Sequence, residues 1–296
     1  MSDDENDELE KILLHGISIP SPPQLLVDVQ MEMLDPDPSL DRITDCICAD
    51  PGISGGILKT LRSPFYGLGD EDVSIRQAVL LLGMKTVFNI INMLSLRSEA
   101  LNERATEEQL KFLNRFWDSS TDIAVSASII ASRSRLVAED NAYLLGLFSN
   151  AGIALMTQRF EDYPEVMAKA YSGMDERIVD TENQCFDTNH AVLGYYMAKS
   201  WKVPKQICEV IRVHHNAHAL LSNRDEQGSP LKDMLAILKL AEHFSCLHKV
   251  LASQNSDVEW DRISEDVLFY LGLSEDDYKD IESFIQERGI GDAALL

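Results

Sequence analysis

The chain has 296 residues, 45% of them hydrophobic, and a formal net charge of −23. Length and composition are typical of a globular protein with one large or two modest domains. No apolar run is long enough for a membrane span, and the acidic start is unlike a signal peptide, so we expect a cytoplasmic protein. The acidic residues concentrate in residues 1–50 and 251–296. Solubility is the simplest role of this charge, and we expect neither nucleic acid nor a membrane as a partner.

Apolar residues recur at helical spacing along most of the chain, and no segment shows the alternation of a strand. Ser39 and Ser74 are suitable N-cap residues, and Pro51 fits the first turn of a helix. Residues 141–157 are apolar nearly all round, so we expect this helix at the centre of the core. We predict an all-α fold. Besides the helices that start near Ser39, Pro51 and Ser74, it has helices at 24–34, 84–96, 106–136, 141–157, 164–172, 188–201, 205–221, 230–250, 262–271 and 275–288.

Two features stand out in the first third of the chain. Gly55 and Gly56 lie inside a predicted helix, where glycine is unfavourable, and this predicts close packing against a neighbour. The loop from Ser63 to Gly69 contains Phe65 and Tyr66. These two rings either anchor a partner protein or close the local core, and we favour the second interpretation.

Polar residues occur on the apolar stripes of several predicted helices. His190, His214 and Glu242 each lie at helical spacing from apolar residues, and so does Asn150. A buried carboxylate needs a partner, because burial disfavours its charged form, so we predict that Glu242 is buried and paired with His190, His214 or His215. The group is either a metal or anion site or a hydrogen-bonded cluster that fixes helix packing. Spacing alone favours the cluster.

Histidines are densest in the run from His214 to His218, and basic residues lie close to it in the sequence. A small anionic ligand could bind here, although a solvated helix face is the simpler interpretation. No phosphate-binding glycine loop, nucleophile elbow or CxxC pair is present, so nucleophilic catalysis is not expected. The basic residues are Lys199, Lys202, Lys205 and Arg212.

Several short motifs follow one another between residues 17 and 220. They are Ile19-Pro20, Asp50-Pro51-Gly52-Ile53, Leu58 to Tyr66, Ser74-Ile75 with Ala78 and Leu82-Gly83, Phe116-Trp117, Leu144 to Gly152, His190, Trp201-Lys202-Val203-Pro204 and Ile211 to His215. In this order they resemble the HDOD family, the HD-related output domains. The resemblance implies an HD-domain-like helical core with an N-terminal helical lobe, and a role in bacterial signal transduction. We accordingly divide the chain into an acidic tail at 1–16, the lobe at 17–100 and the core with C-terminal helices at 101–296.

The resemblance also bears on metal binding. HD hydrolases hold their metal with an early histidine, a His-Asp doublet, further histidines and a late aspartate. Here the early position falls near Asp118-Ser119, the doublet on Ser149-Asn150 and the late aspartate on Glu242, while only His190 and His214-His215 keep a metal-binding residue type. Without the doublet no metal-activated water is expected. The resemblance thus implies no catalytic residue, no cofactor and no bound metal, with His190, His214 and Glu242 as the weak candidates for one.

We therefore expect a non-catalytic regulatory module that binds a partner protein or a small anionic ligand. Two alternatives remain open. One is a residual metal-dependent phosphohydrolase of the HD type, and the other is a nucleotide-sensing module without turnover. The candidate residues for a ligand site or polar cluster are Ser149, Asn150, His190, His214, His215 and Glu242.

Overall fold

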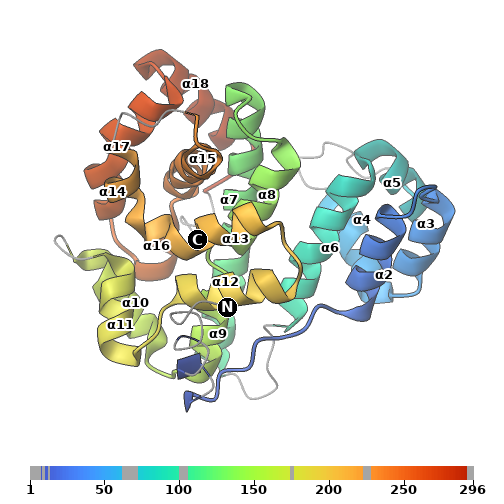
Figure 1. Cartoon of the computed structure of the whole chain (residues 1–296), viewed down its shortest axis with the longest axis horizontal. Helices are drawn as coiled ribbons and strands as arrows, with labels where there is room; N and C mark the ends of the chain where they lie inside the picture. Colours follow the sequence, from blue (N-terminus) through green and yellow to red (C-terminus); the bar gives the residue numbers. More distant parts are fainter. Residues whose placement is uncertain are drawn as a thin grey trace. The chain divides into compact units, whose positions relative to one another are not determined.

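The computed structural model of the chain describes residue 8 and residues 11–12, 14–61, 73–99, 106–173, 177–222 and 228–291. All regular elements in these ranges are helices, which confirms the predicted all-α class. The helices form two compact units (Figure 1). One combines Met1–Pro20 with Ala100–Leu296, and the other is Ser21–Glu99. The predicted loop with Phe65 and Tyr66 lies outside the described residues.

The unit Ser21–Glu99 is built on short amphipathic helices whose apolar sides meet in a core that includes Leu26, Ile47, Ile57 and Val79. Its helices are α2 (Gln24–Met33), α3 (Leu40–Cys48), α4 (Pro51–Leu61), α5 (Ile75–Leu82) and α6 (Met84–Glu99). In the described part of the chain no single helix is long and apolar enough to cross a membrane. Only α5 and α6 taken together reach that length and composition, and they are bent by 116° where they join.

The glycine pair in α4 is only half explained by close packing. A Cβ added to Gly56 would lie 2.6 Å from a methyl carbon of Leu94 in α6, so close packing at this position is confirmed. A Cβ added to Gly55 would meet nothing within 4 Å, so the same expectation is wrong there. The two helices therefore approach each other on the Gly56 side of α4 alone.

In the unit formed by Met1–Pro20 and Ala100–Leu296, the long helix α7 packs against α8 and α15, and α15 also contacts α13 and α17 (Figure 1). Residues 142–157 are all buried, as expected for the centre of the core. The helices are α7 (Glu107–Ser134), α8 (Glu139–Phe148), α9 (Gly152–Arg159), α10 (Tyr163–Ser172), α11 (Ile178–Phe186), α12 (His190–Ser200), α13 (Lys205–Val213), the short 3₁₀ helix η1 (His214–Asn216), α14 (Ala217–Leu221), α15 (Pro230–Phe244), α16 (Leu247–Ala252), α17 (Val258–Leu271) and α18 (Glu275–Gln286).

The described residues near the N-terminus pack on this unit. Glu8, in the predicted acidic tail, accepts a hydrogen bond from Arg212 at 2.8 Å. Ile12 is buried, and the indole nitrogen of Trp201 donates to the carbonyl oxygen of Pro20 at 3.0 Å. This segment is thus held by an ion pair, by apolar burial and by a backbone contact.

Three of the predicted long helices are divided, and α11 was not predicted at all. The 141–157 segment is split into α8 and α9, the 205–221 segment changes to η1, and the 230–250 segment is interrupted at Cys246, whose φ is 52°. Apolar residues continue on both sides of each break, so periodicity carries no sign of it. The first two breaks are where Ser149, Asn150, His214 and His215 lie.

The break between α8 and α9 coincides with a close helix crossing. A Cβ added to Gly152 would lie 2.0 Å from the carbonyl oxygen of His190 and 2.8 Å from the amide nitrogen of Gly194. Both atoms belong to the backbone of α12, which cannot move away as a flexible side chain can. Only glycine fits between these two helices without displacing one of them.

Gly152→Ala should therefore destabilise the protein by at least about 1–3 kcal/mol, because overpacking forces the backbone to shift. Gly55→Ala is the contrast: it lies in a helix with open space around it, and should increase stability by about 1 kcal/mol. Thermal unfolding of both variants measures the difference. Equal melting temperatures for Gly152→Ala and the unmodified protein would contradict the crossing geometry.

A group of polar side chains around Asp257 joins the C-terminal helices. Its carboxylate accepts hydrogen bonds from His243 Nδ1 at 2.9 Å and, as the N-cap of α17, from the amide of Trp260 at 3.0 Å. The ring of His243 also stacks on Trp260 with centroids 4.3 Å apart. Burial opposes the charge of Asp257, but bonds from His243 and His248 outweigh it and hold the pKa of this carboxyl well below 3.8.

A carboxyl whose pKa is depressed in the folded state stabilises the fold above its unfolded pKa, and this stabilisation is lost as the pH falls below that value. Asp257→Asn should lower the free energy of unfolding by about 1–3 kcal/mol at pH 6, with a difference that shrinks below about pH 4. Urea unfolding across this range measures it. Glu275→Gln, at an exposed ion pair with Lys279, is the control and should have little effect at any pH. A pH-independent effect of Asp257→Asn would contradict this account.

Candidate functional site

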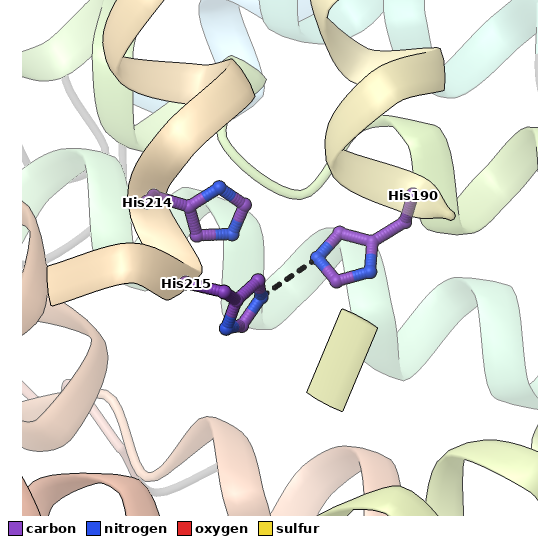
Figure 2. A group of neighbouring side chains, drawn as sticks. All are labelled: His190, His214 and His215. Carbon is purple, nitrogen blue, oxygen red and sulfur yellow. Dashed lines mark hydrogen bonds between the residues drawn. The ribbon is translucent and has the colours of Figure 1, made fainter. Parts of the chain in front are cut away.

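Three histidine rings meet inside the larger unit (Figure 2). His190 is the first residue of α12, and the side chain of Asn189 caps that helix. His214 and His215 follow each other in η1, directly after α13. His190 and His214 are fully buried and His215 is 7% exposed. The Nε2 atoms of His190 and His215 lie 3.0 Å apart. The structure thus brings together the three histidines predicted for the site.

The Nδ1 atom of each ring has an acceptor. His190 Nδ1 lies 2.7 Å from a carboxylate oxygen of Glu182, and His215 Nδ1 lies 2.9 Å from one of Glu259. His214 Nδ1 lies 2.6 Å from the carbonyl oxygen of Ile211. Because ionised carboxylates and carbonyls only accept hydrogen bonds, all three Nδ1 atoms carry the proton. In the neutral rings, all three Nε2 atoms then present a lone pair.

Burial keeps His214 and His215 neutral. It is the largest influence on both rings, and it lowers the pKa of each well below 6.5. The ammonium of Lys239 lowers the pKa of both rings further, and protonation of one imidazole would disfavour protonation of the next. The lone pairs on Nε2 are therefore available at neutral pH.

Glu182 is a site residue that the sequence interpretation missed. It lies fully buried on α11, where one oxygen accepts from Tyr163 at 2.6 Å and the other pairs with His190. Burial, followed by the charge of Glu182, raises the pKa of Tyr163 well above 10.0. Residues 178, 179, 182 and 186 are all buried on one side of α11, and this spacing was the signal that could have revealed the helix and its carboxylate.

Glu242 is buried, as predicted, but its predicted pairing with a histidine is wrong. Its oxygens accept from Asn150 Nδ2 at 2.9 Å and from Lys239 Nζ at 2.9 Å. Lys239 lies one helical turn earlier on α15 and donates also to Glu259, at 3.1 Å. Burial disfavours the charge of Lys239, but the two carboxylates outweigh it and raise the pKa of the ammonium above 10.5. Glu259 therefore connects the histidines to this ion pair.

The two residues at the doublet position are used for local hydrogen bonds. Ser149 Oγ donates to the carbonyl oxygen of Gly146 at 3.1 Å and accepts from Asn150 Nδ2 at 3.1 Å. The amide of Asn150 points one donor at Glu242, and its Oδ1 has no hydrogen-bond partner among the described residues. Neither side chain extends the histidine cluster. The position of the early histidine of HD hydrolases, near Asp118-Ser119, falls on α7. Ser119 is buried and Asp118 is exposed.

The predicted basic group does not surround the histidines. Arg212 is engaged by Glu8, and Lys199 lies over the ring of Tyr195. A different set of residues borders a cavity of about 330 Å³ beside His215, and it includes Arg177, His218, Arg262 and Glu259. An anion that reaches the cluster would meet these side chains.

The buried ion pair can be tested directly. Lys239→Met removes the ammonium between Glu242 and Glu259 and should lower the free energy of unfolding by about 3–5 kcal/mol. The double variant Lys239→Met/Glu242→Gln removes one of the two charges left unpaired, and should recover part of that loss. Lys279→Met, at an exposed pair with Glu275, serves as the control. Urea unfolding of the four proteins gives the comparison, and wild-type stability of Lys239→Met would refute the role of the ammonium.

Comparison of the sequence with known proteins identifies a family and a relative. A model of the HDOD domain matches residues 19–217. A protein of Treponema pallidum is 25% identical over 231 residues, which are 76% of this chain. The chain spans only 42% of the length of that relative.

Several solved structures share the fold. The structure of an HDOD domain protein from Geobacter sulfurreducens has a TM-score of 0.70 and 20% identity, over 99% of this chain and 98% of its own. A Marinobacter aquaeolei structure, provisionally named a signal transduction protein, has a TM-score of 0.69 and 18% identity, over 99% and 65% of the two chains. One from Shewanella amazonensis, provisionally named a metal-dependent phosphohydrolase, has a TM-score of 0.64 and 20% identity, over 96% and 97%. Together with the family model, which covers more than half of the sequence, these likenesses agree with the geometry, and the chain belongs to the HDOD family.

Proposed function

We propose that this HDOD protein is a regulatory module that binds a small phosphate-bearing anion beside His215 and does not hydrolyse it. The observation that carries the proposal is the cavity of about 330 Å³, where two arginines and His218 gather next to His215. This volume is in the range of sites for small organic ligands. Arginine is well suited to phosphate, because its planar guanidinium donates two parallel hydrogen bonds.

The basic side chains at the cavity are held by acidic neighbours. Arg177 pairs with Asp180 and also donates to Asn216. His218 lies 3.4 Å from Asp266. These contacts orient the cationic groups before a ligand arrives, which lowers the conformational entropy lost on binding. They also mean that only an anion with several acceptor oxygens competes well with the carboxylates already present.

Absence of turnover is supported by the chemistry at the doublet position. A hydrolase of the HD type needs an aspartate there, and this chain has Asn150, whose amide donates to Glu242. The cation that pairs with Glu242 is the ammonium of Lys239, which carries no water to activate. The provisional name of the Marinobacter relative, a signal transduction protein, agrees with a regulatory role.

Binding can be tested with a defined panel: inorganic pyrophosphate, nucleoside monophosphates and cyclic dinucleotides. We expect at least one of them to raise the melting temperature. Its affinity should fall roughly tenfold or more in Arg262→Gln and in Arg177→Gln, because each removes a charged hydrogen-bond donor. Arg212→Gln is the matched control, since Glu8 engages that guanidinium, and it should bind as the unmodified protein does.

Product analysis by chromatography, with Mg²⁺, Mn²⁺ or Zn²⁺ present, separates binding from turnover. We expect the bound compound to be recovered unchanged. Hydrolysis that disappears in His190→Gln would instead establish the residual phosphohydrolase. The anion site would be refuted if no compound of the panel binds. It would also be refuted if Arg262→Gln and Arg177→Gln both bind with the affinity of the unmodified protein.

A further inference from the structure

The histidine cluster contains more lone pairs than its own hydrogen bonds can use. His190 Nε2 and His215 Nε2 are 3.0 Å apart, yet each Nδ1 already donates its proton to a carboxylate. Two neutral rings in these tautomers would place lone pair against lone pair, which is repulsive. A positive species must therefore lie between the two nitrogens, either a shared proton or a metal cation.

His214 distinguishes these two possibilities. Its ring is fully buried, its Nδ1 is taken by the carbonyl oxygen of Ile211, and its Nε2 has no hydrogen-bond partner among the described residues. One proton between His190 and His215 leaves this third buried nitrogen unsatisfied, which is unfavourable. A metal ion accepts all three lone pairs at once, and one ligand nitrogen from each ring lies within 4.8 Å of the others.

The spacing and the outer hydrogen bonds fit such an ion. Two nitrogens on one tetrahedral zinc ion, each at about 2.0–2.1 Å, lie about 3.3 Å apart, close to the 3.0 Å between His190 and His215. Metal-bound histidines usually donate their other nitrogen to a carboxylate or a carbonyl, which raises the basicity of the ligand. Glu182, Glu259 and the carbonyl of Ile211 hold all three rings in this way.

The charge of the surroundings favours a dication. Glu182, Glu242 and Glu259 bring three carboxylates into the network, and Lys239 is the one ammonium that pairs with any of them in the described hydrogen-bond network. The carboxylates of this network thus outnumber its ammonium groups, and a cation among the three rings would offset that excess of negative charge. His215 and Glu259 also line the cavity of about 330 Å³, so an ion can reach the cluster from that side.

We propose that His190, His214 and His215 form a mononuclear site for a divalent first-row transition metal of the zinc type. Three imidazole nitrogens suit Zn²⁺, Co²⁺, Ni²⁺ or Fe²⁺ and not Mg²⁺ or Ca²⁺, which require oxygen ligands. The site consists of the histidines that this chain keeps from the HD set, without Ser149–Asn150 or Glu242, because Asn150 and Lys239 already satisfy that carboxylate. The ion joins η1 to the start of α12 and, through the outer carboxylates, to α11 and α17.

Cobalt titration of untagged protein, stripped of metal by chelation, tests the site. We expect one Co²⁺ per chain, with the visible d–d absorption of a nitrogen-ligated ion of low coordination number. Zn²⁺ should displace it and bleach that absorption, and Mg²⁺ should not. Zinc should also raise the melting temperature, because a ligand that binds only the folded state stabilises it.

Variants separate the metal from the shared proton. His214→Gln should weaken Co²⁺ binding more than tenfold and alter the spectrum, whereas it leaves a proton between His190 and His215 untouched. Glu182→Gln keeps an acceptor for His190 and should weaken binding about 10–100-fold, as loss of an outer partner does. His15→Gln, at a histidine whose ring lies against Phe160 outside the cluster and the cavity, is the control and should bind normally.

Circular dichroism of each variant checks that it is folded, and Glu182→Gln provides the test if His214→Gln does not fold. Absence of stoichiometric Co²⁺ or Zn²⁺ binding would overturn the proposal. So would normal binding and an unchanged spectrum in a folded His214→Gln. These readouts use the metal alone, so they are independent of whether any phosphate-bearing compound binds beside His215.

Discussion

A carboxylate in a helical core must find donors or a cation there, and this requirement organises the larger unit. Glu182, Glu242 and Glu259 come from three different helices and converge on one polar network. Their partners are histidine rings, a tyrosine hydroxyl, an amide and the ammonium of Lys239. Because each partner comes from a particular helix at a particular depth, the network admits one packing arrangement and opposes sliding of the helices. Apolar burial provides the driving force, and the polar contacts select the register.

Helical periodicity found only the part of this network that lies on apolar stripes. His190, His214 and Glu242 have apolar neighbours at three and four residues, so burial could be inferred for each. Glu182 was not predicted as a site residue because residues 180–184 are all polar. The segment has too few apolar residues for a buried helix to be recognised. Lys239 was not predicted for another reason. A lysine on a helix is normally exposed, and this one is buried because its ammonium pairs with two carboxylates, Glu242 and Glu259.

The pairings could not be read from spacing because they depend on where helices end. Asn150 reaches Glu242 across 92 positions of sequence from a turn between α8 and α9, a turn that the apolar pattern conceals. His214 and His215 both lie against His190 at the point where α13 ends and the chain continues as η1. The fold class follows from composition and periodicity, whereas the site follows from these interruptions.

The residue at the doublet position and the lysine on α15 act together. An aspartate at position 150 would place a second carboxylate against Glu242, and that pair would require a cation between them. Asn150 instead donates a hydrogen bond, and the ammonium of Lys239 neutralises Glu242 from within the chain. On this side of the network no diffusible ion is needed. On the other side, the three imidazoles have used their Nδ1 protons on Glu182, Glu259 and the carbonyl oxygen of Ile211. The two halves meet at Glu259, which pairs with both His215 and Lys239. Positive charge at the histidines and the ammonium on α15 therefore share one acceptor, the carboxylate that α17 contributes to the core.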